Sequence, residues 1–326
     1  MREFIDFKDG LLLINKHAGV SSFGIIKILQ DELSTTCGLK RKEFPKLGHG
    51  GTLDPFATGL LTVCVGKGVK LARYFLGATK TYEGVILFGQ TTVPGDPTAP
   101  ISETSDSIPE SLEQLQKLAT ALTKQAYSQT PPMHSAKKVD GKPLYELARA
   151  GIEIDRDPKI CQLYRFEILS YEKPRAHFRL VCSSGTYVRT LSQDFAKLLG
   201  SVGMLESLSR TAIGGFQLEN AWNCEQITQA MKEGKAWTEL PCWIPFDKLL
   251  EGYDSVQVTS SETAALFQGK QSVLLHVLKR SEPNPSLKNP IGLDQCLAIY
   301  EGEKLIAVAR KDDSKWGLER VFVRGN

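Results

Sequence analysis

Apolar and polar residues follow one another along the amino-terminal part of the chain in a pattern that predicts strands and helices. The apolar run 10–15 ends in polar residues and predicts a buried strand. Ser21 or Ser22 should cap the helix that follows. That helix is expected to turn four apolar residues toward a core: Phe23, Ile25, Ile26 and Leu29. Two further apolar runs, 59–66 and 82–88, predict two more strands.

The next stretch continues in mixed order. Residues 112–122 have the spacing of an amphipathic helix, and a shorter helix is expected over about 144–150. Residues 176–182 predict a strand, which leads into a helix across 187–199. The segment 89–109 is rich in Pro, Ser and Thr and predicts an exposed loop. Because regular β-α-β alternation is missing, the order favours an α+β fold with a mixed, largely antiparallel sheet.

The pattern of apolar and polar residues changes near residue 252. Short β-like runs separated by turns follow, at 255–258, 273–278, 297–300, 305–309 and 320–323. At 326 residues, the chain is also longer than one compact core usually holds. We therefore expect an α+β domain over about 1–250 with an exposed insertion at about 92–154, and a small all-β module over 253–326.

Composition narrows the class of protein. Hydrophobic residues make up 41% and charged residues 24%, with a mean hydropathy of −0.18, which is typical of a globular chain and excludes disordered and collagenous proteins. The longest apolar runs fall far short of the ~20 residues needed to cross a bilayer. Acidic residues interrupt the apolar start of the chain, unlike in a signal peptide. We expect a cytoplasmic protein with no membrane partner.

Net charge and cysteine content do not by themselves identify a function. A net charge of +3 is too small to establish a nucleic-acid partner, since polyanion binding needs only a local basic patch. The seven cysteines are scattered without a C-x-x-C pair, which predicts reduced, mostly buried thiols and no metal site. Gly66-Lys67 after an apolar run suggests a phosphate loop, but Leu61 stands where that motif requires glycine. A nucleoside triphosphate site is therefore not expected.

The segment 48–61, with the sequence GHGGTLDPFATGLL, carries the strongest candidate chemistry. Its four glycines permit tight turns and let another molecule approach the main chain. Pro55 biases the preceding Asp54 away from helical geometry. From the residues alone, Asp54 either caps the next element or forms, with His49, a site for nucleophilic or acid–base work.

This segment resembles the G-H-x-G-[TA]-L-D-P-x-A-[TS]-G-L-L signature of the TruB-type tRNA pseudouridine synthases. Five further blocks are similar to that family and follow in its order: 11–22 (LLLINKHAGVSS), 80–82 (KTY), 131–138 (PPMHSAKK), 185–191 (GTYVRTL) and 208–211 (LSRT). Together the blocks cover roughly residues 10–215. The resemblance implies the pseudouridine-synthase fold with a carboxy-terminal PUA-like module.

The same resemblance implies the isomerisation of uridine to pseudouridine in the T loop of tRNA, at position 55, without a cofactor. Asp54 would be the nucleophile, attacking the ribose or assisting formation of a glycal. Arg189 would form a bidentate pair with Asp54 and keep it charged, unless it forms only a structural ion pair. Tyr82 would stack on the target base, the alternative being a tyrosine that merely fills the core.

Four further pocket residues follow from the matched blocks. Tyr187 and Leu208 would line the base pocket, and His49 would touch the base or a neighbouring nucleotide. Lys16 would support the floor of the pocket or meet a phosphate. Because a uridine within a folded loop cannot reach a buried carboxylate, the base must be flipped out of its stack.

The basic segment 39–46 is either a solvated loop or a phosphate contact. Candidate contacts to the RNA backbone are Lys40, Arg41, Lys42, Lys67, Lys70, Arg73, Lys137, Lys138 and Lys142. Expected partners are the T stem-loop of tRNA and no obligate protein, with the chain acting as a monomer. The rival interpretations are a tRNA-binding folding helper, a paralogue that modifies other RNAs, and a guide-dependent enzyme.

Several positions depart from the family pattern. Gly50 stands where Thr or Ser is usual, His17 replaces a proline, and His134 replaces a tyrosine. The segment 91–97 lacks the common T-D-T-x-D pattern. None of these departures touches the nucleophile, its arginine or the pocket tyrosines, so they bear on RNA docking, particularly by the thumb-like segment 130–154, rather than on the reaction.

Overall fold

A mixed sheet forms the centre of the protein. The computed structural model describes residues 8–38, 40–133, 135, 138–139, 142–280, 296–312 and 315–322. Within these ranges, nine strands form one sheet in the order β11-β12-β4-β13-β3-β1-β15, with β14 paired to β13 and β2 to β3. The strands are β1 (Gly10–Lys16), β2 (Leu47–His49), β3 (Thr58–Val65), β4 (Lys80–Phe88), β11 (Leu163–Glu172), β12 (Arg175–Cys182), β13 (Gly203–Ile213), β14 (Phe216–Gln217) and β15 (Trp243–Pro245). Only β13 and β3 pair in parallel among these strands, which confirms the expected α+β fold with a largely antiparallel sheet.

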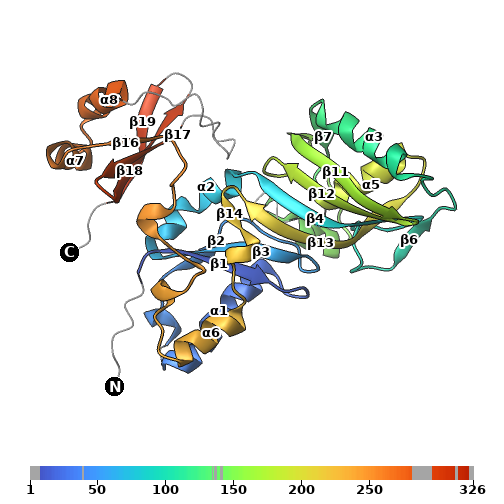
Figure 1. Ribbon diagram of the computed structural model, residues 1–326, viewed down its shortest axis with the longest axis horizontal. Helices are drawn as coiled ribbons and strands as arrows, with labels where there is room; N and C mark the ends of the chain where they lie inside the picture. The colour runs from blue at the N-terminus through green and yellow to red at the C-terminus, as the bar shows by residue number, and fades with distance from the viewer. Residues whose placement is uncertain are drawn as a thin grey trace.

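Helices cover the two ends of this sheet and create two hydrophobic cores. In Figure 1, α1 (Ser22–Cys37) and α6 (Cys224–Lys232) lie beside β1, whereas α3 (Leu112–Thr123) and α5 (Val188–Leu198) lie at the β11 end. The short helix α2 (Ala72–Gly77) precedes β4. One core gathers around β1, β3 and α1, and the other around β4, β12 and α5. Each half of the sheet therefore has its own hydrophobic core.

Helix α1 begins as expected and buries three of the four residues predicted for its core face. Ser21 is its N-cap, since its Oγ accepts a hydrogen bond from the Gly24 N–H at 3.0 Å. The buried stripe continues through Ile26, Leu29 and Leu33, whereas Phe23 is 63% exposed. Phe23 falls between the rows set by the 3.6-residue period, so its assignment to the core was wrong.

The carboxy-terminal part contains a four-stranded sheet and two helices. The strands β16 (Ser255–Gln257), β17 (Cys296–Glu301), β18 (Lys304–Asp312) and β19 (Lys315–Val321) pair in that order. Between β16 and β17 lie α7 (Ser260–Phe267) and α8 (Gln271–Arg280). The prediction of an all-β module is thus wrong: the run 273–278 belongs to α8, where Leu274 and Val277 share the buried face. A short apolar run does not distinguish a strand from a buried helix.

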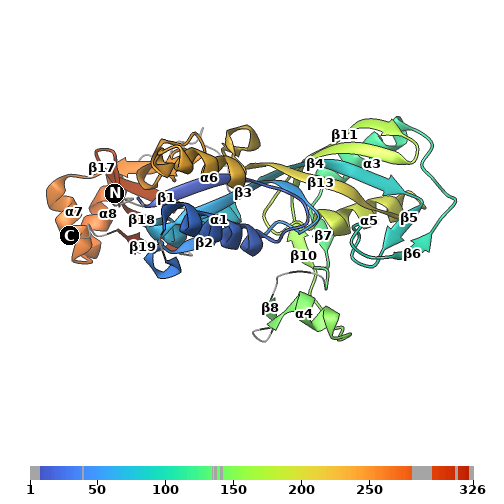
Figure 2. The ribbon, with the colours of Figure 1, turned by 90° about the horizontal axis from the view of Figure 1, so that it is seen from below.

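The expected insertion is also smaller than 92–154. Helix α3 buries Leu115 and Ala119 in the second core, so it belongs to the body of the protein. The strands β7 (Tyr127–Gln129) and β10 (Lys159–Cys161) form a two-stranded ladder. The projecting part contains β8 (Lys138–Val139), β9 (Lys142–Pro143) and α4 (Leu144–Arg149), and in Figure 2 it extends away from the rest of the chain.

The segment 89–109 is not simply an exposed loop. It contains the paired strands β5 (Gln90–Thr92) and β6 (Ile101–Thr104). Thr92 is fully buried and Asp96 is 5% exposed. The Thr92 Oγ1 donates to the Asp96 carbonyl at 2.6 Å, which closes the turn between the two strands. Polar side chains here stabilise buried structure that composition alone does not predict.

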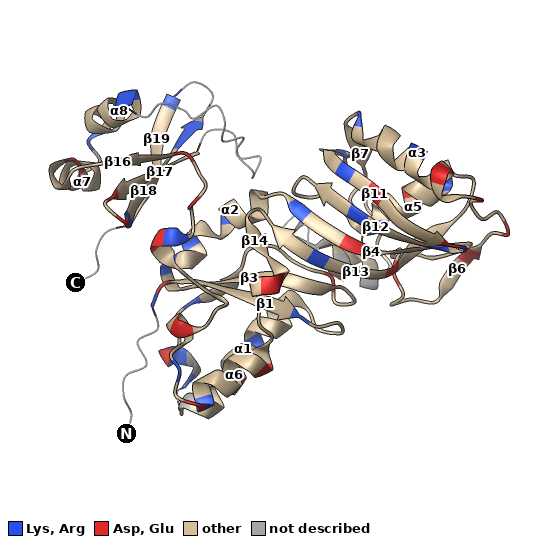
Figure 3. Ribbon diagram, viewed as in Figure 1, with Lys and Arg blue, Asp and Glu red and all other residues tan. Residues whose placement is uncertain are grey.

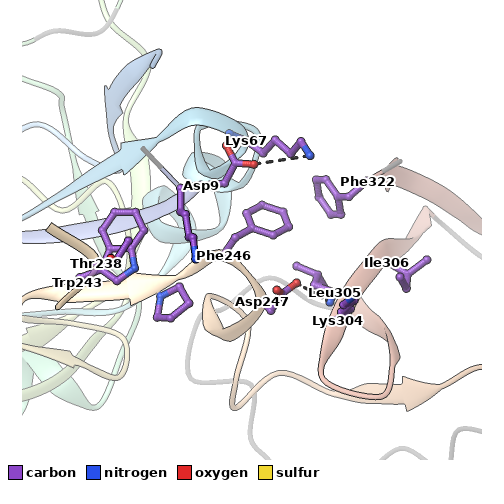
Figure 4. A pocket seen from close by; sticks show the side chains of 12 residues that line it. Asp9, Lys67, Thr238, Trp243, Phe246, Asp247, Lys304, Leu305, Ile306 and Phe322 are labelled. Carbon is purple, nitrogen blue, oxygen red and sulfur yellow. Dashed lines mark hydrogen bonds and ion pairs between the residues drawn. The ribbon is translucent and has the colours of Figure 1, made fainter. Parts of the chain in front are cut away.

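A pocket of about 580 Å³ lies where the carboxy-terminal sheet meets β1 and β15 (Figure 4). The rings of Phe246 and Phe322 pack edge to face there with centroids 4.9 Å apart. The Asp247 Oδ1 accepts the Leu305 N–H at 2.9 Å. This pocket is larger than the one beside Asp54, but its aromatic and acidic groups hold the two parts of the chain together.

Candidate active site

Asp54 lies on the loop between β2 and β3, and α1 fixes this loop. The Ser22 hydroxyl, buried at the start of α1, accepts the Leu53 N–H at 2.8 Å and donates to the Leu53 carbonyl at 3.2 Å. The Asp54 carbonyl accepts the Ala57 N–H at 3.1 Å, closing a turn around Pro55. Gly51 has a φ of 139°, a conformation that L side chains rarely adopt. The glycine-rich segment therefore presents Asp54 in one orientation.

Arg189, at the start of α5, holds the Asp54 carboxylate through two hydrogen bonds. Its Nε lies 2.8 Å from Asp54 Oδ2, and its Nη2 lies 3.1 Å from Oδ1. The side chain of Arg189 is 4% exposed and that of Asp54 is 34% exposed. Such bidentate, charge-assisted pairs are stronger than neutral hydrogen bonds and fix direction as well as charge. One side of Asp54 thus stays open while the other is held.

A second carboxylate, which sequence reasoning missed, completes the surroundings of Arg189. Asp96 Oδ2 lies 3.6 Å from the Arg189 Nε, and the Arg189 Nη1 donates to the Pro94 carbonyl at 3.0 Å. Asp96 Oδ1 also accepts the Thr98 N–H at 2.9 Å. The missing T-D-T-x-D pattern hid this residue, yet its first Thr and last Asp are present as Thr92 and Asp96. Those two retained positions could have indicated Asp96 as a site residue.

A pocket of about 250 Å³ opens beside Asp54. Tyr82, Tyr187 and Leu208, all predicted for the base pocket, line it together with Asp54. Burial raises the pKa of Tyr82 to about 12, so its phenol stays protonated at neutral pH. The structure therefore places these three side chains around the open side of the candidate nucleophile.

Lys16 and His49 lie near the pocket but do not line it. The Lys16 Nζ donates to the carbonyls of His17, Val20 and Pro55 at 2.8–3.1 Å. Burial lowers the Lys16 pKa to about 8, although the Asp54 carboxylate opposes the shift. Because Lys16 is fully buried and its three donors are used, it supports the loop rather than meeting a phosphate.

His49 lies on β2, with its Nδ1 buried and without a hydrogen-bond partner in the part of the chain that the structure describes. Burial, and to a smaller extent the Arg210 charge, lower the pKa of His49. Its imidazole is consequently neutral at pH 7. The expected contact of His49 with the base or with a neighbouring nucleotide stays a prediction.

Two buried cations of the pocket wall belong to matched blocks, but sequence reasoning gave them no role. Arg210 is 1% exposed and donates to three carbonyls, those of Gly51, Thr52 and Leu60, at 2.8–3.3 Å. The Lys80 Nζ donates to the carbonyls of Phe75, Leu76 and Ala78 at 2.5–3.1 Å. Burial lowers the Lys80 pKa to about 7. Both side chains fix the backbone around the pocket.

The candidate phosphate contacts divide into separate groups. Lys40, Lys42 and Lys70 are exposed. Lys67 pairs with Asp9, and Arg73 with Glu319, so these two serve the junction with the carboxy-terminal sheet. Lys137, like His134, lies outside the described residues, as do the side chains of Arg41, Lys138 and Lys142. On the sheet, basic and acidic positions are interspersed (Figure 3), as in the pairs Arg175–Glu206 and Arg179–Glu83.

The described part of the chain contains no group of three His, Cys, Asp or Glu residues placed to hold a metal ion. The six cysteines whose side chains it describes are buried free thiols: Cys64, Cys161, Cys182, Cys224, Cys242 and Cys296. None of its helices combines the length and the apolar character that spanning a membrane requires.

The resemblance to pseudouridine synthases implies a carboxylate held by an arginine and facing a pocket with two tyrosines. The structure has this arrangement beside the interior strands β4 and β13 of the sheet. Residues 39–188 match the family described as "TruB family pseudouridylate synthase (N terminal domain)". Relatives called tRNA pseudouridine synthase B are 41% identical over 229 residues in Bordetella avium and 35% identical over 272 residues in an Azoarcus species. The first alignment covers 70% of this chain and 90% of the relative, the second 81% and 83%. The chain belongs to the TruB family of pseudouridine synthases.

Solved structures confirm the fold. The chain aligns with a structure described as "Crystal Structure of a Cbf5-Nop10-Gar1 Complex" at a TM-score of 0.65 and 19% identity, covering 97% of this chain and 84% of that one. A second structure, of an H/ACA RNP bound to a substrate RNA containing 2'-deoxyuridine, gives a TM-score of 0.66 at 18% identity. That alignment covers 98% of this chain and 86% of the other. The similarity therefore includes the carboxy-terminal sheet as well as the central one.

Proposed function

We propose that this protein converts uridine to pseudouridine at position 55 in the T loop of tRNA, acting as a single chain without a guide RNA. The observation that carries the proposal is the open carboxylate of Asp54, held by Arg189 and facing the pocket that Tyr82 and Tyr187 line. The names of the relatives, which denote tRNA pseudouridine synthases, support tRNA as the substrate.

The reaction is an isomerisation in which atoms are conserved. The N1–C1′ bond of uridine breaks, the detached uracil turns, and a C5–C1′ bond forms; the C5 proton leaves, and N1 ends with a proton. Asp54 attacks C1′, or else assists removal of a ribose proton to give a glycal. Because no electrons or groups are exchanged with another molecule, the chemistry consumes no cofactor.

The pocket side chains have separate roles in this reaction. The flipped uracil stacks on Tyr82, while Tyr187 and Leu208 enclose it and exclude water. Arg189 holds the Asp54 carboxylate in one direction through two hydrogen bonds, and the Asp96 carboxylate lies 3.6 Å from the Arg189 Nε. Outside the pocket, exposed lysines such as Lys40 and Lys42 attract the RNA backbone.

The decisive experiment compares the wild type with Asp54→Asn on a tRNA transcript and on an isolated T stem-loop. We expect the purified wild type to form pseudouridine at position 55 in both RNAs, and the variant to bind them without forming product. If the wild type and Asp54→Asn bind tRNA with equal affinity and the wild type forms no product, the folding-helper interpretation is favoured. A requirement for an added guide RNA would contradict the proposal, and product at other uridines only would point to a different target.

A further inference from the structure

Ser135 contributes an unpaired hydroxyl to the pocket beside Asp54. The residue is 5% exposed and lines the same pocket as Asp54 and Tyr82. Its backbone N–H donates to the Met133 carbonyl at 2.9 Å. Its Oγ, however, has no hydrogen-bond partner among the residues that the structure describes. A buried hydroxyl without a partner is unusual in a folded protein and calls for an explanation.

Most other polar groups of this pocket are occupied by the protein itself. Each of the three Lys80 donors is directed at a carbonyl, and Arg210 donates to three carbonyls. The Thr186 hydroxyl donates to the Ser183 carbonyl at 3.0 Å, and the Ser183 Oγ accepts the Gln162 N–H at 2.9 Å. These groups shape the pocket, whereas the Ser135 hydroxyl is still available for a ligand.

We propose that the Ser135 hydroxyl hydrogen-bonds to the polar edge of the uracil ring when the base is flipped into the pocket. The inference rests on the proposed function, because it takes uridine as the substrate. Along this edge, uracil carries two carbonyl oxygens that accept hydrogen bonds and one N–H that donates. A serine hydroxyl can both donate and accept, so it matches any of the three groups.

This dual character suits an isomerisation in which the base turns between bond breaking and bond making. Turning the ring to bring C5 to C1′ changes which polar group faces a fixed point of the pocket wall. A lysine or arginine in that place could meet only an acceptor. The Ser135 hydroxyl rotates about a single bond and can follow the base from uridine to pseudouridine. Ser135 is thus a base-contacting residue that serves both states.

Removal of the hydroxyl tests the inference. In single-turnover assays on a T stem-loop, we expect Ser135→Ala to form pseudouridine about fivefold to tenfold more slowly, the usual effect of one hydrogen bond. Ser135→Thr keeps a hydroxyl and should recover part of the rate. Ser201→Ala is the matched control, because Ser201 is also buried but its Oγ donates to the Val202 carbonyl away from the pocket. It should leave the rate unchanged.

A binding comparison separates contact with the base from a general disturbance of the site. In the Asp54→Asn background, which prevents turnover, affinity is measured for a T stem-loop with uridine at position 55 and for one with an abasic residue there. We expect Ser135→Ala to weaken binding of the uridine RNA about fivefold and to leave the abasic RNA unaffected.

Two outcomes would overturn the inference. Equal rates and affinities for Ser135→Ala and the wild-type side chain would show that the hydroxyl makes no contact with the base. Equal weakening for uridine and abasic RNA would place any contact on the backbone instead. Failure of the proposed function is recognised separately, because the wild type would then bind RNA without forming pseudouridine, while the comparison of the two RNAs would still report on Ser135.

Discussion

Replacing Arg189 by lysine tests whether the site needs the shape of the guanidinium or only its charge. The substitution removes both hydrogen bonds to Asp54 and the one to the Pro94 carbonyl. Lysine retains one positive charge but lacks the planar fork that fits a carboxylate. We expect Arg189→Lys to be nearly inactive and less stable than the wild type, although its net charge is unchanged.

The magnitude follows from burial. Breaking a buried ion pair costs about 3–5 kcal/mol when one partner is left uncompensated. Arg189 is almost fully buried, but Asp54 is partly solvated and the lysine still supplies a charge. We therefore expect the free energy of unfolding of Arg189→Lys to fall by about 2–3 kcal/mol. For a domain of roughly 150–250 residues, this corresponds to a fall in Tm of about 4–12 °C. A displacement of Asp54 by about 1 Å would slow the reaction roughly 100-fold.

The assay exploits the loss of the C5 proton. Tritium at C5 of uridine is released to water as pseudouridine forms, so its release reports turnover, while thermal unfolding reports stability. Arg175→Lys is the matched control, because Arg175 makes an equally bidentate pair with Glu206 but at the exposed surface. We expect no measurable change there. Near wild-type turnover and Tm for Arg189→Lys would refute the argument from geometry.

Three further predictions concern other parts of the site. Asp54→Asn should abolish tritium release while tRNA affinity, measured by filter binding, changes little. Gln129→Leu removes the side chain that bonds both the N–H and the carbonyl of Tyr187; we expect a higher KM and about 1–3 kcal/mol lower stability in urea unfolding. Between about pH 7 and 10, Lys80 is neutral in the folded protein but still protonated in the unfolded chain, so the free energy of unfolding should rise with pH. Lys80→Met should flatten this rise when unfolding is measured as a function of pH.

The sequence predicted the elements with clear apolar runs or spacing, and the predictions failed where tertiary contacts decide the structure. Strands β1, β4 and β12 and helix α5 lie close to their predicted ranges. The short apolar run in α8 fits either period, and only its packing against the carboxy-terminal sheet makes it helical. The β5–β6 pair depends on buried Thr and Asp side chains, for which hydrophobic patterning carries no signal.

The candidate site divides in the same way. Matched blocks indicated Asp54, Tyr82 and Arg189, and the structure brings them together although 135 positions separate the aspartate from the arginine. Asp96 and Arg210 escaped notice because charged residues are usually exposed, and a sequence does not show which of them are buried. Their burial becomes evident only from the carbonyls and counter-charges that surround them in the folded protein.

Buried and exposed cations consequently serve different purposes in this protein. Near Asp54, two buried cations, Lys16 and Arg210, are directed at backbone carbonyls and stabilise loops instead of presenting charge to RNA. Lys40, by contrast, is exposed, and we propose that such exposed cations contact the phosphate backbone. Since a net charge of +3 leaves little general attraction for a polyanion, RNA affinity has to come from local groups of such exposed residues. In the proposed reaction, recognition of the base then depends on stacking, shape and a few uncharged polar groups inside the pocket.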